Sequence, residues 1–151
     1  MLGSENGGKK WLFVFAHLDD ETILAYGTVA KLVAARNEVR IAICCGAGRA
    51  GRDNRKRMAA FEASVAEVGA SSDWIVGQAD LSLTPEKVDS LLEANLPTFR
   101  PDVVATHSMA SLHPEHRIVA ERVLTACRPS CSSSAVALLA ACSPADSLGH
   151  G

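Results

Sequence analysis

Short apolar segments alternate along the chain with stretches in which apolar residues recur at helical spacing. Apolar runs bounded by polar residues predict strands that are buried on both faces of a sheet; they lie at 11–16, 39–45, 73–76 and 103–106. Spacings of three or four residues predict amphipathic helices, which lie at 22–36, 58–68, 84–96 and 118–127. Four strand–helix repeats in this order predict a parallel sheet with helices on both faces and right-handed crossovers.

Punctuating residues sharpen the expected boundaries. Gly69 is suited to ending the second helix, and Thr84 with Pro85 gives the third helix a cap and a first residue. Pro97 and Pro101 are expected to end that helix, and 107–115 is expected to be a loop. The fold class is therefore α/β, a Rossmann-like, doubly wound and mostly parallel sheet. Ligands of such folds lie beyond the carboxyl ends of the strands.

Composition narrows the class of protein. The chain has 151 residues, 48% of them hydrophobic and 21% charged, which excludes wholesale disorder and suits one domain. A net charge of -2 and only 5% aromatic residues argue against nucleic acid as a partner. No apolar run approaches the roughly 20 residues that a membrane-spanning helix needs. Five cysteines, an odd number, favour a reducing compartment, so we expect a cytoplasmic protein.

Three segments differ in character. Residues 1–10 are polar and glycine-rich and predict a flexible leader, whereas 11–127 carries the strand–helix repeats. Residues 128–151 form a tail rich in Ser, Ala and Cys, in which 136–141 is either one helical turn or a short strand.

Polar residues gather after two of the predicted strands. His17 and the acids Asp19 and Asp20 follow the first strand, while His113 and His116 follow the fourth. Carboxyl ends of parallel strands share one edge of the sheet, so the two clusters are expected to meet. Two imidazoles and one carboxylate suit a catalytic zinc site, where the ion makes a nucleophile of water at neutral pH. A neighbouring carboxylate can then accept the proton.

These two clusters resemble the signatures of one family. Residues 16–21 (AHLDDE) resemble the AHPDDE motif of the LmbE-like/PIG-L-like zinc de-N-acetylases, and 113–117 (HPEHR) resembles their HPDHR motif. Residues 101–104 look like the strand that the family places before the second motif, and the resemblance covers 11 to about 127.

The resemblance implies removal of an acetyl group from an N-acetylglucosamine-type amide on a larger glycoconjugate. It implies metal ligation by His17, Asp20 and His116. Asp19 is similar to the family's general base, and His113 to the residue that stabilises the oxyanion or protonates the leaving amine. Zinc is the expected ion, although the same donors also suit Fe(II).

The chain departs from the family pattern in three places. Leu18 replaces a proline, and Glu115 replaces an aspartate, so its longer side chain is expected to shift a contact to a histidine. Family members continue beyond the second motif with further strands, whereas here the tail follows. A truncated C-terminus is one interpretation, and a shortened, non-catalytic member of the fold is the corresponding alternative function.

A glycine-rich segment at 46–51 raises a second alternative, a nucleotide-binding loop. It fits the pattern GxGxxG, but it follows the second strand, and the basic residues of 52–57 replace the small apolar residues that such a helix start needs. Arg49, Arg52 and Asp80 are candidates for contacting the substrate, and the alternative for each is a solvated side chain. His107 is expected to be a loop residue or to support a ligand. A homo-oligomer stays open.

Overall fold

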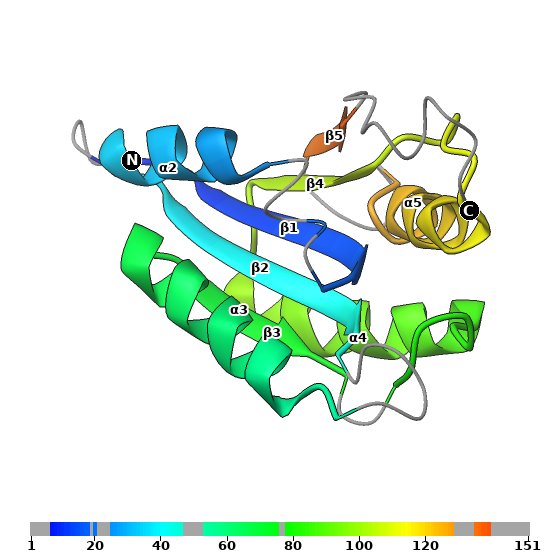
Figure 1. Ribbon diagram of the computed structural model, residues 1–151. Coiled ribbons are helices and arrows are strands. Elements are labelled where there is room, and N and C mark those ends of the chain that lie inside the picture. The colour runs from blue at the N-terminus through cyan, green and yellow to red at the C-terminus, as the bar shows by residue number, and fades with distance from the viewer. Residues whose placement is uncertain are drawn as a thin grey trace.

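The computed structural model describes residues 7–18, 20, 25–46, 53–75 and 78–128, together with the backbone of 135–139. Its centre is a five-stranded sheet in the order β3-β2-β1-β4-β5, and every pair of neighbours is parallel. The strands are β1 (Lys10–His17), β2 (Glu38–Cys45), β3 (Ser71–Trp74), β4 (Val103–His107) and β5 (Ala135–Leu139). The predicted α/β class with a parallel sheet is confirmed (Figure 1).

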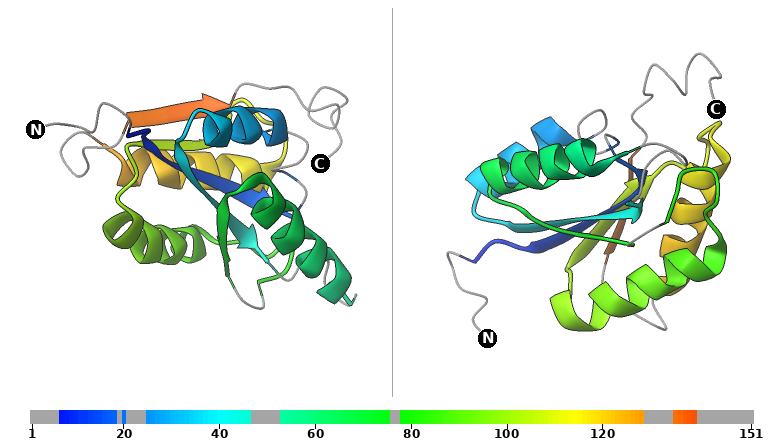
Figure 2. Two further views of the ribbon diagram at one scale, coloured as in Figure 1. Left: turned by 90° about the vertical axis from the view of Figure 1, so that its left-hand side faces the viewer. Right: turned by 60° about the horizontal axis from the view of Figure 1, so that its bottom comes forward.

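Four described helices cover the two faces of the sheet. They are α2 (Tyr26–Ala34), α3 (Arg55–Val68), α4 (Pro85–Phe99) and α5 (Pro114–Ala126). Figure 2 shows α2 and α3 together on one side of the strands and α4 and α5 on the other. This arrangement is the doubly wound, three-layer architecture that right-handed crossovers produce.

Alternate residues of β1 feed two separate cores, as the period of a strand requires. Phe13 and Phe15 pack toward α2 and α3, where Val29 and Phe61 are buried. Leu12 and Val14 lie in the other core, which also contains buried residues of α4 and α5. A strand that is buried on both faces must be apolar at every position, which explains the unbroken run at 11–16.

Several boundaries differ from those that the sequence predicts. β3 is two residues earlier than 73–76, because its pairing with β2 begins at Ser71 opposite Arg40. The prediction that Pro97 ends α4 is wrong: the helix continues to Phe99. The helix tolerates Pro97 in its last turn, and Arg100, with a left-handed φ of 54°, is the cap that follows its last residue.

The fourth helix begins four residues earlier than expected, at Pro114 instead of Ile118. Its first turn is polar, so the apolar periodicity does not reveal it. Within the tail, the strand alternative is correct, since β5 pairs with β4. Gly69 ends α3 with a φ of 87°, and the Thr84 side chain caps α4 by accepting from the Lys87 amide, as predicted.

The topology defines where loops diverge. β1 and β4 are neighbours, yet β1 leads to a helix on one face and β4 to a helix on the other. Such a switch point leaves a crevice at the carboxyl ends of the two strands. Those ends are His17 and His107, so the two histidine-bearing segments meet there as predicted.

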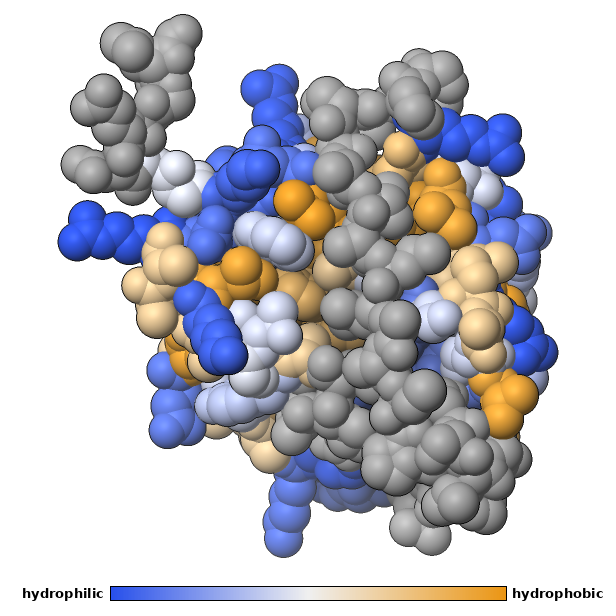
Figure 3. All heavy atoms as spheres, turned by 90° about the horizontal axis from the view of Figure 1, so that it is seen from above, coloured by the Kyte–Doolittle hydropathy of each residue, from blue (hydrophilic) through white to orange (hydrophobic). Residues whose placement is uncertain are grey.

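Hydrophobic side chains of the described residues form small areas on the upper face, separated by hydrophilic ones (Figure 3). Among the helices of the described ranges, none is both long and apolar enough to cross a membrane.

Candidate functional site

The site is assembled from the end of β1 and the beginning of α5. Pro114 opens α5, and His113 caps it: the Glu115 amide donates to His113 Nδ1 over 3.1 Å. Helical geometry then brings His116 into the first turn. The ring centroids of His17 and His116 lie 5.4 Å apart, and those of His113 and His116 lie 4.7 Å apart. Residues separated by about a hundred positions therefore form one cluster.

Asp20 lies at the centre of this cluster. Its Oδ2 is 3.5 Å from His17 Nδ1 and 3.4 Å from His116 Nε2, and it accepts the His17 amide over 2.8 Å. A tetrahedral zinc ion with ligand distances of about 2.0–2.2 Å would separate its donor atoms by roughly 3.3–3.5 Å. Asp20 thus lies at the distance from each histidine that two ligands of one ion require.

The described residues offer further donor sets of the kind that binds metals. Within each set the ligand atoms lie within 4.8 Å of one another, and the sets are His17/His113/His116, Asp20/His107/His116 and His17/Cys45/Glu115. The predicted trio of His17, Asp20 and His116 is not one of these sets among the described residues. The second set is disfavoured because His107 Nε2 already accepts the Ala16 amide over 2.9 Å. That acceptor nitrogen carries no proton, so its 3.5 Å approach to Asp20 is not an ion pair.

Glu115 holds the ring of His17. Its Oε1 lies 2.7 Å from His17 Nε2, and only 4% of the residue is exposed. A carboxylate accepts, so Nε2 donates to Glu115, and Nδ1 is the ring nitrogen that faces Asp20. From the sequence, the longer side chain of Glu115 was expected to shift a contact to a histidine. In the structure Glu115 makes such a contact, to His17.

Charges within the cluster are strongly coupled. Burial alone would lower the pKa of His17, but the hydrogen bond and charge of Asp20, together with Glu115, raise it to about 9. Burial opposes ionisation of Asp20 as well, yet hydrogen bonds to His116 and His17 hold its pKa well below the usual range. The pKa of His113 is lowered, chiefly by burial and by the neighbouring histidines. Without metal, the site pairs an ionised Asp20 with a protonated His17 and keeps His113 neutral.

Two residues support His116: His107, for which the sequence left this role open, and Ser111. His107 is the last residue of β4, not a loop residue, and its buried ring stacks on His116 at 3.8 Å between centroids. Ser111 was not predicted; its Oγ is 3.1 Å from His116 Nδ1 and also accepts the His113 amide. A serine in a polar loop gives no signal in the sequence, because its partner is fixed only by the fold.

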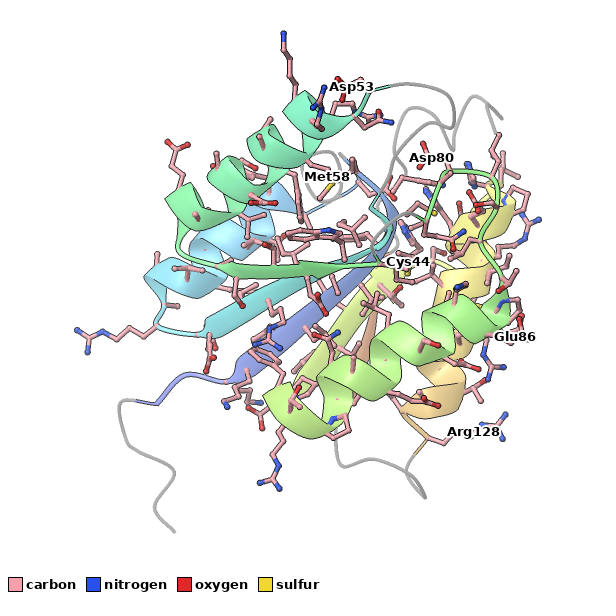
Figure 4. All side chains as sticks on the ribbon, turned by 90° about the horizontal axis from the view of Figure 1, so that it is seen from below. Cys44, Asp53, Met58, Asp80, Glu86 and Arg128 are labelled. Carbon is pink, nitrogen blue, oxygen red and sulfur yellow. The ribbon has the colours of Figure 1, made fainter. Side chains whose placement is uncertain are left out.

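Of the remaining candidate residues, the structure describes Asp80. It lies on the loop between β3 and α4, beyond the ends of the strands; Cys44, near the end of β2, is labelled with it in Figure 4. Burial raises the pKa of Asp80, and its Oδ1 is buried without a hydrogen-bond partner among the residues that the structure describes. Asp19, Arg49 and Arg52 lie outside the described residues.

Packing accounts for the first glycine of the GxGxxG segment. A Cβ at Gly46 would lie 2.6 Å from Trp74 Cδ1 and 2.9 Å from the Ile75 carbonyl oxygen. Residues 47–52 lie outside the described part of the chain. Gly46 also borders a cavity of about 470 Å³ with Asp53 and Met58 at the start of α3 (Figure 4).

The fold and the donor cluster define an α/β protein with a candidate metal centre at its switch point. The sequence of residues 12–127 matches the PIG-L family, described as GlcNAc-PI de-N-acetylase. Because this match covers most of the chain, the protein belongs to the PIG-L family.

One curated relative is a 1D-myo-inositol 2-acetamido-2-deoxy-alpha-D-glucopyranoside deacetylase from Segniliparus rotundus. It is 49% identical over 41 residues, which make up 27% of this chain and 13% of the relative.

Solved structures share the fold at low sequence identity. N,N'-diacetylchitobiose deacetylase from Pyrococcus horikoshii is 22% identical, with a TM-score of 0.65 over 78% of this chain and 48% of that one. A zinc-inhibited form of teicoplanin deacetylase is 14% identical, with a TM-score of 0.64 over 78% and 62%. A 4-carboxy-2-hydroxymuconate hydratase from Pseudomonas putida KT2440 is 18% identical, with a TM-score of 0.62 over 87% and 63%. The chain spans less than two thirds of each of these relatives.

Proposed function

We propose that this protein is a zinc-dependent hydrolase that removes the acetyl group from an N-acetylglucosamine-type glycoconjugate. Membership of the PIG-L family supports the reaction class. The observation that carries the proposal is the convergence of His17 and His116 on Asp20 Oδ2 at 3.5 and 3.4 Å. Because the fold also occurs in a hydratase, the fold alone does not decide the reaction, and the donor cluster must.

In this proposal His17, Asp20 and His116 hold the ion. When bound, a divalent ion supplies Lewis-acid chemistry, which acidifies water and polarises an amide carbonyl. Nitrogen donors with one carboxylate suit zinc, and Fe(II) is the alternative. A deacetylase of the same fold that zinc inhibits is consistent with a site that recognises this metal.

Two residues of the chain are assigned to proton transfer. Asp19, adjacent to a ligand, takes the proton from the attacking water. His113 then protonates the leaving amine or hydrogen-bonds the oxyanion. Its Nδ1 accepts the Glu115 amide, so the neutral ring carries its single proton on Nε2, where it can hydrogen-bond the oxyanion. To protonate the amine, the ring would first need a second proton on Nδ1, which would break that hydrogen bond.

Substrate binding is assigned to the loops around the crevice. Asp80 offers to a sugar hydroxyl its buried Oδ1, which has no hydrogen-bond partner among the described residues and is costly to leave unpaired. Arg49 and Arg52 are proposed to contact the remainder of the glycoconjugate. We place the protein in the cytoplasm, since Cys44, Cys45 and Cys127 are free thiols.

Two substitutions test the site. Asp19→Asn is expected to retain zinc but to lose turnover of an N-acetylglucosamine conjugate, whereas His116→Ala is expected to lose both. Zinc content and acetate release are measured on the same preparations. Full activity of Asp19→Asn would remove Asp19 from the role of base, and activity unaffected by chelation would refute metal dependence.

Thermal melting separates the enzyme from a non-catalytic member of the fold. A ligand that binds the native state stabilises it, by about 2.7 kcal/mol at a hundredfold excess over Kd. We therefore expect one cooperative transition whose midpoint rises with added zinc in the wild type but not in His116→Ala. A broad melt that does not respond to zinc would support the non-catalytic alternative.

A further inference from the structure

The loop of residues 80–83, here called the strap, has an unusual backbone. It joins β3 to α4, and Figure 4 shows it leading from Asp80 toward the start of α4 near Glu86. Leu81 has a φ of 63°, in the left-handed region that side chains other than glycine rarely adopt. Its side chain is 81% exposed, so packing of that side chain does not stabilise this conformation. The backbone of the strap must be held by other contacts.

Gln78 Nε2 donates to the Ser82 carbonyl oxygen over 2.9 Å, and Glu115 supplies two further contacts. The Leu81 amide donates to Glu115 Oε1 and the Leu83 amide donates to Oε2, both over 2.8 Å. Oε1 is the same atom that lies 2.7 Å from His17 Nε2. One buried carboxylate on α5 therefore accepts from three donors, two on the strap and one on the side chain that ends β1.

We propose that Glu115 is a positioning residue that fixes the ring of His17 and the strap together, so that the metal site and the Asp80 side of the crevice keep one geometry. This inference rests on the proposed function for its consequences in catalysis, but its structural part does not. Leu83 is buried in the core beside α4 and anchors the far end of the strap. Glu115 thus controls the near end, which carries Asp80.

The length of the side chain matters for this role. An aspartate at this position of α5 would withdraw the carboxylate by about 1.5 Å, the length of one carbon–carbon bond. Hydrogen bonds of 2.7–2.8 Å to partners on separate segments cannot all survive such a shift. The departure from the family's HPDHR motif at this position is therefore matched to the strap of this chain.

The charge matters as well, since all three partners donate. A glutamine has one acceptor oxygen and one amide nitrogen that only donates. Whichever way the amide is turned, its nitrogen faces a donor: the Leu83 amide in one orientation, or the Leu81 amide and His17 in the other. Glu115→Gln preserves the shape of the side chain and necessarily breaks at least one of these hydrogen bonds.

Amide hydrogen exchange measured by NMR on the full-length protein tests the inference without any substrate. In Glu115→Gln and Glu115→Asp, the Leu81 and Leu83 amides are expected to exchange about tenfold to a hundredfold faster than in the wild type. Amides of β1 and β4 are expected to keep their protection. Glu121→Gln, the same change at an exposed position of α5, is the matched control and should leave the strap unchanged.

Unchanged exchange at Leu81 and Leu83 in both Glu115 variants would overturn the inference, and so would an equal acceleration at every amide, which indicates a merely structural role. If Glu115→Gln does not fold, Glu115→Asp decides. For the proposed reaction, a rise in KM that exceeds any fall in kcat is expected in Glu115→Asp. A strap that responds in a protein without deacetylase activity would refute the proposed function alone. A strap that does not respond in an active deacetylase would refute this inference alone.

Discussion

Substitution of Gly46 by alanine tests whether the glycine-rich segment after β2 begins with a packing requirement. The added Cβ would lie 2.6 Å from Trp74 Cδ1 and 2.9 Å from the Ile75 carbonyl oxygen, distances at which atoms must move. A backbone oxygen yields little, and the Trp74 ring already contacts Phe61 of α3. Overpacking of this kind costs about 1–3 kcal/mol. For a chain of this length each kcal/mol lowers the melting temperature by roughly 2–4 °C.

Chemical denaturation and thermal melting of Gly46→Ala measure this cost. Gly27→Ala is the matched control, because no atom lies within 4 Å of its added Cβ and it lies inside α2. A glycine in a helix is less favourable than alanine by about 0.5–1 kcal/mol, so this control should gain stability. Equal stability of Gly46→Ala and wild type would refute the packing explanation. Saturable binding of a dinucleotide that Gly46→Ala abolishes would favour the nucleotide-binding alternative.

Three further predictions concern the site and the scaffold. Zinc binds unprotonated imidazole, and the His17 pKa is about 9, so the affinity of the protein for zinc should rise about tenfold per pH unit from pH 7 to about 9. Calorimetry in two buffers should detect the proton that His17 releases when zinc binds. A zinc affinity that stays constant over this pH range would contradict the prediction. Burial raises the pKa of the Cys44 and Cys45 thiols, so peptide mapping should find them alkylated only after unfolding. Thr84→Ala should cost about 1 kcal/mol in denaturant unfolding, and no loss would show that the cap is redundant.

The parallel sheet could be predicted because β1 and β4 contain unbroken apolar runs, at 11–16 and 103–105, which burial on both faces explains. The loops that follow these two strands leave the same edge of the sheet, so His17 and His116 were expected to lie close together. The start of α5 could not be located from periodicity, because its first turn carries Glu115 and His116, which face other polar groups instead of a core. In the first turn of α5, residues of the candidate site occupy positions at which apolar residues would otherwise identify a helix.

The supporting contacts could not be predicted for a different reason. Ser111 is a donor or acceptor like any other serine, and its contact with His116 depends on how the loop after β4 turns. The left-handed backbone of Leu81 could not be predicted either, because a leucine gives no indication of a positive φ. The Ser111 contact and the Leu81 backbone both depend on partners elsewhere in the chain. Local sequence patterns therefore do not predict them.

Hydrogen bonds to the ring nitrogens support one choice among the overlapping donor sets. His17 Nε2 is engaged by Glu115, and His113 Nδ1 by the backbone that it caps. His107 Nε2 accepts a backbone amide, and His116 Nδ1 contacts Ser111. These contacts direct His17 Nδ1 and His116 Nε2 toward Asp20, and each nitrogen lies at a ligand-to-ligand distance from the same carboxylate oxygen. Because His113 Nδ1 accepts a backbone amide, the neutral ring carries its proton on Nε2 and has no lone pair there for an ion, which is consistent with the proposal that His17, Asp20 and His116 are the ligands.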